Sequence, residues 1–163
     1  MDGIEVRAPT MVELPAVHRR VIAAWGAPIM VVHGVGYDLT ALPVIVAMHR
    51  GHLVGAVTYR IDAGRMELAS MNAFQPRRGI GTALLGAVVR TARHRGADLV
   101  WCTTTNDNLD ALRFYQRRGF RLVGIRPGAV DQSRRRRPEI PTVGAYGIAI
   151  RDELDLALEL RSP

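Results

Sequence analysis

Two segments of the chain combine glycine, arginine, asparagine and tyrosine at spacings that suit ligand binding and proton transfer. The first, residues 75–84, reads Gln-Pro-Arg-Arg-Gly-Ile-Gly-Thr-Ala-Leu, and Gly79 and Gly81 fall where a helix is predicted to begin. Glycine allows a ligand to approach the free amides of a helix start closely, and those amides and the helix dipole attract an anion. Arg77 and Arg78 add positive charge beside them. This segment therefore predicts a phosphate or pyrophosphate site.

Two widespread phosphate-binding motifs do not fit this segment. A P-loop needs a lysine after its glycine, and the chain contains no lysine. A Rossmann fingerprint needs a third glycine where this chain has Leu84. Close packing between a helix and a strand is the remaining, purely structural explanation for the two glycines.

The second segment spans residues 103–120 and places three useful side chains on one helical face. Asn108, Ala111 and Tyr115 are spaced i, i+3 and i+7, so they lie on the same side of a helix. They offer an amide that can pair with a ligand, a small residue that permits close approach, and a phenol that can give up a proton. Taken alone, Asn108 also fits a helix cap and Tyr115 also fits a half-buried core position.

Hydrophobic patterning predicts the elements that position these segments. A first helix begins at a capping box formed by Thr10 and Glu13 and runs to Trp25. Two further helices are expected over residues 79–95 and 108–118. Strands are expected over residues 4–6, 42–49, 52–61, 65–73, 97–104, 120–125 and 153–160. Residues 26–41 show no clear period, and residues 126–152 form a long Pro- and Gly-punctuated segment with room for one more strand near 144–150.

This order predicts a single α/β domain of the α+β type over residues 1–163, a mixed sheet covered by helices. No apolar run approaches the roughly 20 residues that cross a bilayer, and the N-terminus does not resemble a signal peptide. Cys102 is the only cysteine, so neither an internal disulfide nor a cysteine-rich metal site is expected. We therefore expect a cytoplasmic protein without a metal and without membrane association.

The formal net charge is +7, carried entirely by arginine. Such a charge can attract nucleic acid or polyphosphate, but no nucleic-acid reader motif and no aromatic residues interleaved with basic ones accompany it, so no nucleic-acid partner is expected. The densest cluster, residues 134–137, is four consecutive arginines. A solvated loop is the first interpretation, and contact with the substrate or with a cofactor phosphate is the alternative.

Taken together, the two segments resemble the GNAT superfamily of acyl-CoA-dependent N-acetyltransferases. The resemblance rests on Arg-Arg-Gly-Ile-Gly-Thr-Ala-Leu-Leu at residues 77–85, followed by Asn-x-x-Ala-x-x-x-Tyr-x-x-x-Gly-Phe at residues 108–120. It covers residues 44–125, and Pro76 stands where the family usually has Gln or Arg. The resemblance implies a mixed, mostly antiparallel sheet of six to seven strands, flanked by helices and splayed between the fourth and fifth strands.

By this resemblance, the co-substrate is acetyl-CoA. The backbone of the helix start would hold the CoA pyrophosphate, and the pantetheine arm would pair with the end of the fourth strand. Asn108 would hydrogen-bond the arm from the other side, with Ala111 and Tyr115 on the same helical face. The implied cofactor-binding residues are Met71, Asn72, Ala73, Arg77, Arg78, Gly79, Ile80, Gly81, Thr82, Ala83, Asn108, Ala111 and Tyr115.

The resemblance also implies direct attack of a neutral amine on the thioester. A backbone amide near residues 71–73 would stabilise the oxyanion, and Tyr115 would protonate the leaving thiolate. Glu67, on the strand before the glycine loop, is the first candidate for the general base, with an exposed strand carboxylate as its alternative interpretation. His33 and His52 titrate in a useful range but lie in no recognised motif. Asp107 also fits a simple helix cap.

The acceptor amine is not identified by the sequence. Residues 25–42, Tyr59 and residues 126–149 are left to recognise it, and Trp25, His33, Tyr37 and Tyr146 would line a pocket or serve as packing residues. A longer acyl-CoA donor, a CoA-binding sensor without turnover, and a homodimer stay open.

Overall fold

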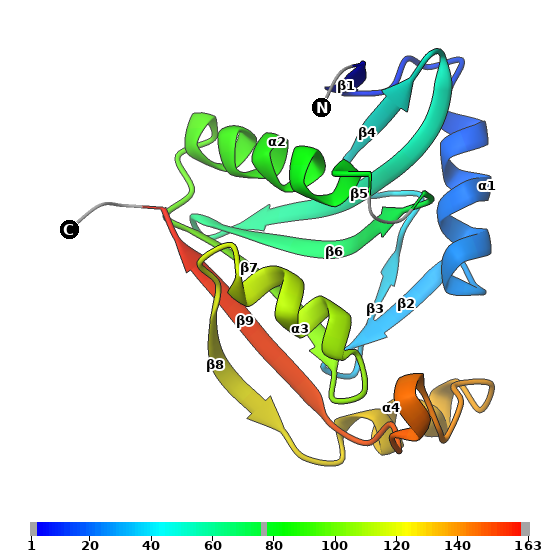
Figure 1. Ribbon diagram of the computed structural model, residues 1–163. Helices are drawn as coiled ribbons and strands as arrows, with labels where there is room; N and C mark the ends of the chain where they lie inside the picture. Colours follow the sequence, from blue (N-terminus) through cyan, green and yellow to red (C-terminus); the bar gives the residue numbers. More distant parts are fainter. Residues whose placement is uncertain (1–2, 76–77, 161–163) are drawn as a thin grey trace.

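The computed structural model describes residues 3–75 and 78–160, and it contains a seven-stranded mixed sheet (Figure 1). The strand order is β1-β4-β5-β6-β7-β9-β8, and every neighbouring pair is antiparallel except β6 and β7. The strands of this sheet are β1 Ile4–Arg7, β4 Val44–His49, β5 His52–Asp62, β6 Arg65–Ala73, β7 Leu99–Thr105, β8 Arg121–Arg126 and β9 Glu153–Glu159. The predicted mixed, mostly antiparallel sheet is confirmed.

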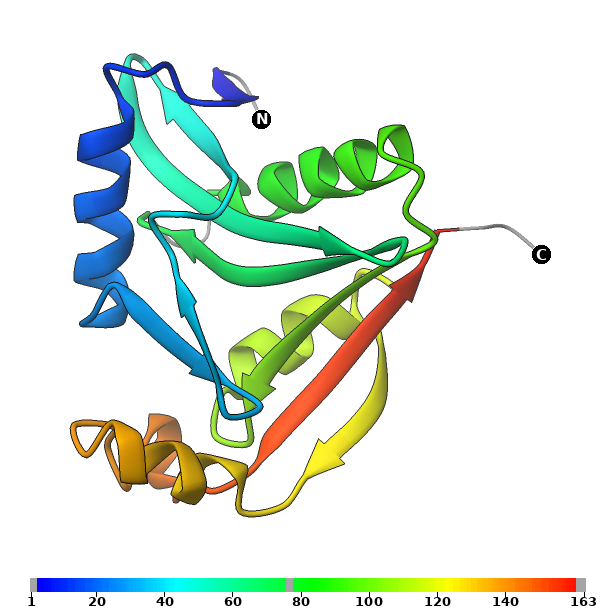
Figure 2. The same ribbon diagram turned by 180° about the vertical axis from the view of Figure 1, so that it is seen from behind.

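Different elements cover the two faces of the sheet (Figures 1 and 2). The helices α2 (Ile80–His94) and α3 (Leu109–Gln116) lie on one side, called here the helix face. On the opposite side, called here the hairpin face, lie α1 (Leu14–Trp25) and the two-stranded hairpin of β2 (Ile29–Val32) and β3 (Val35–Asp38). In the described part of the chain, no helix is both long and apolar enough to span a membrane.

Each face has its own hydrophobic core, because alternate residues of the strands point to opposite sides of the sheet. The helix-face core includes Val57, Met66, Leu84, Val88, Val100, Tyr115 and Leu156. The hairpin-face core includes Val17, Val21, Met30, Leu39, Val46, Ala56 and Ala69. Removing these apolar side chains from water is the main force that holds α1 and α2 against the sheet.

The helix ends form close to where the sequence predicts them. The Thr10 N–H donates to Glu13 Oε2 at 2.7 Å, which is half of the expected capping box. Hydrogen bonds from Arg7 at 2.8 Å lower the pKa of the Glu13 carboxyl to about 2. Gly96 and Gly119, placed after the second and third helices, have the positive φ values of 71° and 88° that favour glycine.

The sheet opens between β6 and β7, the predicted fourth and fifth strands. Their parallel pairing joins residues 65–68 to residues 99–102 and ends at Leu68 and Cys102. Both strands continue beyond that point, β6 to Ala73 and β7 to Thr105, and they diverge (Figure 1). The predicted splay is thus confirmed. The point where the pairing ends, at Leu68 and Cys102, is called here the splay point.

Two regions differ from the sequence interpretation. Residues 26–41, which show no clear period, form the β2–β3 hairpin, and the segment 126–152 contains the helix α4 (Ala129–Arg136). Residues 144–150 form a 3₁₀ turn at Ala145–Gly147 and one isolated bridge between Val143 and Ala149 rather than a strand. Short strands and a helix rich in arginine give little periodic signal, so tertiary contacts decide these elements.

Candidate active site

The predicted anion site lies at the start of α2. Gly79 occupies the N-cap position with a left-handed φ of 76°, and no side chain of residues 3–75 or 78–160 caps the helix there. The backbone N–H groups of Ile80, Gly81 and Thr82 lie in the first turn, where no carbonyl of a preceding turn can accept their hydrogen bonds within the helix. They are therefore free to bind an anion. Arg78 is exposed beside them. The predicted contacts of Arg77, and the departure at Pro76, lie outside the described residues.

Gly81 also has a packing role, which agrees with the alternative explanation that the two glycines permit close packing of the helix. A Cβ built on Gly81 would stand 3.1 Å from the Phe114 ring, so the start of α2 and the side of α3 meet closely there. The Arg118 guanidinium lies 3.8 Å from the Phe114 ring centroid and donates to Thr82 Oγ1 at 2.5 Å. Arg118 thus brings a positive charge to the first turn of α2, which the sequence did not indicate because the contact joins two helices.

The end of β6 has a neighbouring strand on one side only. Met71, Asn72 and Ala73 pair with β5, while on the other side β7 has already diverged. The Asn72 side chain accepts a hydrogen bond of 2.9 Å from Trp25 Nε1, which ties the end of α1 to this strand. The backbone on the open side of residues 71–73 is therefore available to an extended ligand arm.

The second predicted segment forms α3 and brings its three residues to one face. Asn108 is the N-cap of α3, and its Oδ1 accepts from the Ala111 N–H at 3.1 Å. Capping a helix is the role that the residue type alone suggests for Asn108. A contact of Asn108 with CoA stays a prediction. Ala111 is half-buried, and Tyr115 is buried in the helix-face core.

Tyr115 meets Cys102 at the splay point. The Tyr115 hydroxyl and the Cys102 thiol are neighbours that influence each other's pKa, and Cys102 is the last residue of β7 that pairs with β6. Burial raises the pKa of the Cys102 thiol to about 12, and burial together with this neighbour raises the pKa of the Tyr115 hydroxyl well above its ordinary value. Both groups therefore stay protonated at neutral pH.

The hairpin face carries a row of polar side chains, because paired residues of neighbouring strands point to the same side. Glu67 pairs with Arg60 on β5 and with Trp101 on β7, and the Arg60 guanidinium forms an ion pair with the Glu67 carboxylate. Thr103 pairs with Asp155 across β7 and β9. The side chains of Arg60, Glu67, Trp101, Thr103, Glu153 and Asp155 are called here the polar row.

Three carboxylates of the polar row are buried, which is costly unless charged or hydrogen-bonding partners surround them. The exposed fraction is 3% for Glu67, 4% for Glu153 and 7% for Asp155. Arg126 Nη2 donates to Asp155 Oδ2 at 2.7 Å. The sequence singles out Glu67 but not Glu153 and Asp155, because their alternation with leucines indicates only a strand.

His33 lies over the polar row. Its Nε2 is 2.9 Å from Asp155 Oδ1 and 3.0 Å from Thr103 Oγ1, and its ring stacks on Trp101 with a centroid separation of 5.7 Å. The His33 backbone N–H donates to Glu153 Oε2 at 3.1 Å. The hairpin thus brings His33, which sequence reasoning could not assign, onto the buried carboxylates.

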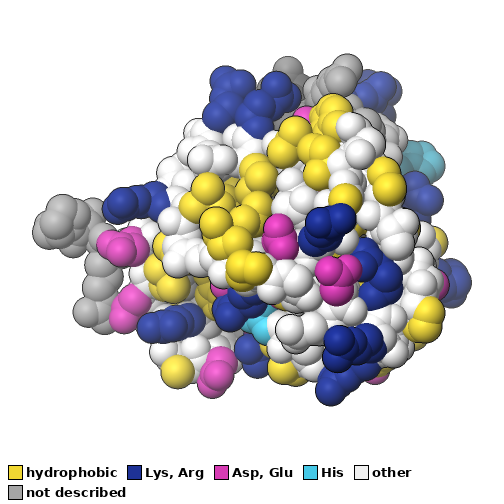
Figure 3. All heavy atoms as spheres, turned by 90° about the horizontal axis from the view of Figure 1, so that it is seen from below, with side chains coloured by type: hydrophobic (Ala, Val, Ile, Leu, Met, Phe, Trp, Pro, Cys, Tyr) yellow, Lys and Arg dark blue, Asp and Glu magenta, His cyan; other side chains and the backbone are white. Residues whose placement is uncertain are grey.

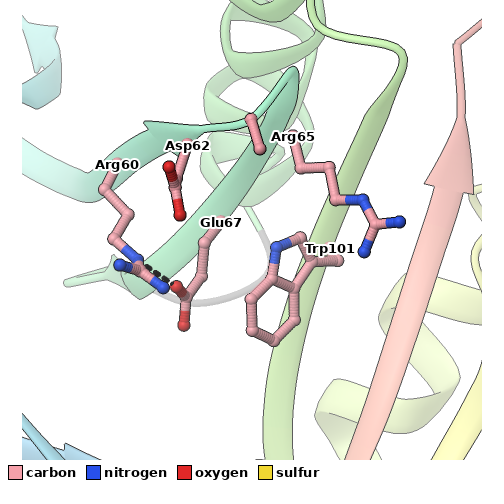
Figure 4. A pocket seen from close by; sticks show the side chains of 6 residues that line it. Arg60, Asp62, Arg65, Glu67 and Trp101 are labelled. Atoms are coloured by element: carbon pink, nitrogen blue, oxygen red, sulfur yellow. Dashed lines mark hydrogen bonds and ion pairs between the residues drawn. The ribbon is translucent and has the colours of Figure 1, made fainter.

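A pocket of about 300 Å³ opens on the same face (Figure 4). Figure 4 views it with α2 behind the strands, so that Glu67 and Trp101 face the reader and Arg60 reaches Glu67. Its lining residues are Arg60, Asp62, Ala63, Arg65, Glu67 and Trp101. Tyr37 lies beside it, with the Arg60 guanidinium 4.9 Å from its ring centroid.

The other sequence candidates lie away from the splay point or have structural partners. His52 begins β5 next to the β4–β5 turn, and Tyr59 packs against the helix-face core. Asp107 accepts from Thr105 Oγ1 at 2.5 Å and from the Ala145 N–H at 2.9 Å. Tyr146 donates its hydroxyl to Asp110 at 2.8 Å. Of the four residues expected to line a pocket, Trp25, His33 and Tyr37 lie on the hairpin face, and Tyr37 is the one beside the pocket, against Arg60.

The run of four arginines closes α4 rather than forming a loop, and three of its members bind backbone carbonyls. Arg136 Nη1 donates to the Gly34 carbonyl at 2.6 Å and Arg137 Nη1 to the Ile29 carbonyl at 2.9 Å, so both hold the β2–β3 hairpin. Arg134 bonds the carbonyl oxygen of Ile150 at 2.7 Å. Figure 3 shows that arginines at this end of the molecule are dispersed among acidic and apolar side chains.

The sequence matches known proteins over most of its length. Residues 23–120 match the model of the acetyltransferase (GNAT) family. The chain is 39% identical to the uncharacterized protein YdhI of Bacillus subtilis over 80% of this chain and 82% of that protein. It is 38% identical to the uncharacterized protein YxbD of the same organism, over 84% and 87% respectively. The chain therefore belongs to the GNAT acetyltransferase family.

Solved structures show the same fold. A GNAT family acetyltransferase from Elizabethkingia anophelis, solved with acetyl-CoA bound, superposes with a TM-score of 0.72 at 20% identity. The match covers 98% of this chain and 100% of that one. The chain thus has the fold of this solved acetyltransferase, and as a member of the GNAT acetyltransferase family it is an acyltransferase.

Proposed function

We propose that the protein transfers the acetyl group of acetyl-CoA to a primary amine by direct attack of that amine on the thioester. The observation that carries the proposal is the splay point: the uncapped start of α2 and the Tyr115 hydroxyl flank it on the helix face, and polar groups line it on the hairpin face. A thioester lying between β6 and β7 would be open to an acid from one side and to an amine from the other.

The start of α2 is suited to the CoA pyrophosphate. Its free amides and the positive end of the helix dipole favour an anion, and Arg78 and Arg118 supply charge on either side. The open edge of residues 71–73 would pair with the pantetheine arm as an added strand, and one of these amides would bind the oxyanion. The acetyl-CoA in the structurally similar Elizabethkingia anophelis protein supports this co-substrate.

Tyr115 would act as the general acid. Because its pKa is raised well above the ordinary value, the hydroxyl keeps its proton and can donate it to the CoA sulfur. In the structure this hydroxyl contacts the Cys102 sulfur, so a thioester sulfur entering the splay would replace one sulfur partner with another.

The state of Cys102 supports direct attack over a covalent acetyl-enzyme. A cysteine nucleophile reacts as the thiolate, and a pKa of about 12 leaves almost none at neutral pH. Glu67 and His33 both lie on the hairpin face, where a base would take the proton of the attacking amine. The Glu67 carboxylate is engaged by Arg60, and the His33 imidazole is held by Asp155 and Thr103 of the polar row.

Calorimetric titration of the protein with acetyl-CoA, with CoA and NAD as controls, tests the proposal. We expect saturable one-site binding of acetyl-CoA and CoA but not of NAD, followed by acetyl transfer when primary amines are added. Binding without transfer to any amine would favour a CoA-binding sensor. Absence of binding at millimolar acetyl-CoA would contradict the proposed function.

A further inference from the structure

His33 occupies a left-handed backbone conformation, which is uncommon for residues other than glycine. It is the first central residue of the β2–β3 turn, with φ 52°, and Gly34 follows with φ 72°. Two consecutive positive φ values define a type I′ turn, in which Asn-Gly is preferred over His-Gly. Arg50 and Ala63 hold the same position in two other hairpin turns, with φ 50° and 47°, so what distinguishes His33 is not the turn but the contacts of its side chain.

The surroundings of His33 hold its imidazole in one orientation. Because an ionised carboxylate only accepts hydrogen bonds, the 2.9 Å contact with Asp155 Oδ1 places the proton on Nε2. Thr103 donates to the same oxygen at 2.7 Å, and Trp101 stacks on the ring. Among the described residues, no hydrogen bond to Nδ1 is found, so this nitrogen presents a lone pair. The side chain is 20% exposed and thus accessible.

The charged groups around this imidazole come from four elements. Asp155 and Glu153 lie on β9, with the Glu153 Oε2 at 3.7 Å from Nε2. Arg126 of β8 neutralises the second oxygen of Asp155, and Arg136 of α4 bonds the Gly34 carbonyl. Glu67 of β6, already paired with Arg60, lies along the same row. One carboxylate, Glu153, thus faces His33 without an arginine partner in the described part of the chain.

His33 also lies on the hairpin face of the splay point, opposite Tyr115 on the helix face. Cys102 and Thr103 are adjacent in β7 and therefore point to opposite faces. Cys102 contacts Tyr115 on the helix face, and Thr103 contacts His33 on the hairpin face, one residue beyond the last pairing with β6. A thioester at the splay point would thus have Tyr115 on one side and His33 on the other.

Glu67 is less well placed for the same task. It lies within the paired part of β6 and β7, opposite Trp101, rather than where the strands have separated. Its side chain is 4% exposed, and the Arg60 guanidinium occupies its carboxylate. A proton acceptor there would have to give up its ion pair, which is costly for a buried charge.

We propose that His33 is the general base of acetyl transfer and that Asp155 is the residue that positions it. This inference rests on the proposed function. As the amine nitrogen bonds to the thioester carbon, His33 Nδ1 takes the proton that the nitrogen loses. The C–S bond breaks, and the leaving sulfur receives the Tyr115 proton. The imidazolium then loses a proton to solvent and the Tyr115 phenolate regains one, which restores both groups.

The test measures acetyl transfer from acetyl-CoA to spermidine, tyramine and kanamycin as a function of pH. His33→Asn is the informative variant, because Asn-Gly suits the type I′ turn while the amide cannot accept a proton at neutral pH. We expect kcat/KM for the amine to fall about 100-fold, within the range for a lost general base, with KM for acetyl-CoA unchanged. The acidic limb of the wild-type pH profile should disappear, and Tm should stay the same or rise.

Three further variants distinguish the roles. Glu67→Gln should keep the acidic limb. Asp155→Asn should lower kcat but have little further effect in the His33→Asn background, since the two act as one unit. Arg126→Gln, which removes the ion pair to Asp155 Oδ2 but leaves the contact of Oδ1 with His33, is the control and should keep the acidic limb, shifted toward higher pH because Asp155 is then less neutralised.

The outcomes separate this inference from the proposed function. Acetyl-CoA that binds but is transferred to none of the three amines would overturn the proposed function and this inference with it. Transfer whose acidic limb survives in His33→Asn, or vanishes in Glu67→Gln instead, would overturn this inference alone.

Discussion

The two faces of the sheet assemble their functional residues in opposite ways. On the helix face, the residues come from two short segments, 78–83 and 108–115, each of which forms a local unit. On the hairpin face, His33 contacts residues that follow it by 70, 120 and 122 positions along the chain. The residues of the helix face are brought together by a helix start and by the helical period. Those of the hairpin face are brought together by the register of the paired strands.

This difference explains why the donor side of the reaction is easier to recognise than the acceptor side. A pyrophosphate is bound by backbone amides at a helix start, and such a site is recognisable from glycines that stand close together in the sequence. A site for an amine and its base needs side chains from several strands to point to the same side. Thr103 and Asp155 meet because β7 and β9 pair in one particular register.

The largest expected effect is on the helix face, at Gly81. Gly81→Glu should weaken acetyl-CoA binding at least about 100-fold, because it places a negative charge at the predicted pyrophosphate site. Gly81→Gln is the matched control: its Cβ also meets Phe114 at 3.1 Å and its bulk is that of glutamate, but it adds no charge. Calorimetric titration of both variants separates charge from packing, and equal affinities for the two would contradict the placement of the pyrophosphate.

The second effect concerns proton donation from the same face. Tyr115→Phe should lower turnover at least about tenfold, since general acid catalysis commonly contributes more than that, while acetyl-CoA binding is kept. Steady-state kinetics with one accepted amine, together with calorimetry, measures both quantities. Turnover equal to that of the wild type would remove Tyr115 from the mechanism.

A smaller effect is expected on the local stability of the β2–β3 hairpin, which α4 holds in place. Arg136→Ala removes the hydrogen bond to the Gly34 carbonyl. One such bond contributes about 1–1.5 kcal/mol, so its loss should raise the equilibrium constant for local opening of the hairpin by up to roughly tenfold. Hydrogen exchange of residues 29–38 should accelerate accordingly, while exchange in α2 stays unchanged. Arg135→Ala, an exposed neighbour on the same helix, serves as the control. Identical exchange in both variants would mean that α4 does not stabilise the hairpin.

The smallest effect is expected at Cys102. Cys102→Ala should keep turnover within about threefold, because a thiol with a pKa of about 12 does not act as a nucleophile at neutral pH. Mass spectrometry of the wild type after incubation with acetyl-CoA should find no acetylated Cys102. An acetyl-enzyme that forms and then transfers its group to an amine would replace direct attack with a covalent mechanism.

Much of the fold followed from patterns in the sequence, and the exceptions have physical causes. The strands around Gly55 and Ser70 were predicted from apolar runs, and the ends of α2 and α3 from the glycines that follow them. The β2–β3 hairpin was not predicted, since its strands are four residues each and its turn is His-Gly rather than Asn-Gly. The helix α4 carries arginines on most of its last turn and is held by Arg134 and its carbonyl partners.

The sequence by itself determined the glycine-rich start of α2, the Asn108–Tyr115 face of α3 and the splay that the family resemblance implies. These features are encoded within short stretches, where helix periodicity and glycine geometry act locally. Tertiary structure alone decided that His33, Thr103 and Asp155 form one cluster and that the arginines of α4 hold the hairpin over it. The physical reason is register: strand pairing and the docking of a turn bring distant residues together, and neither leaves a periodic signal in the sequence.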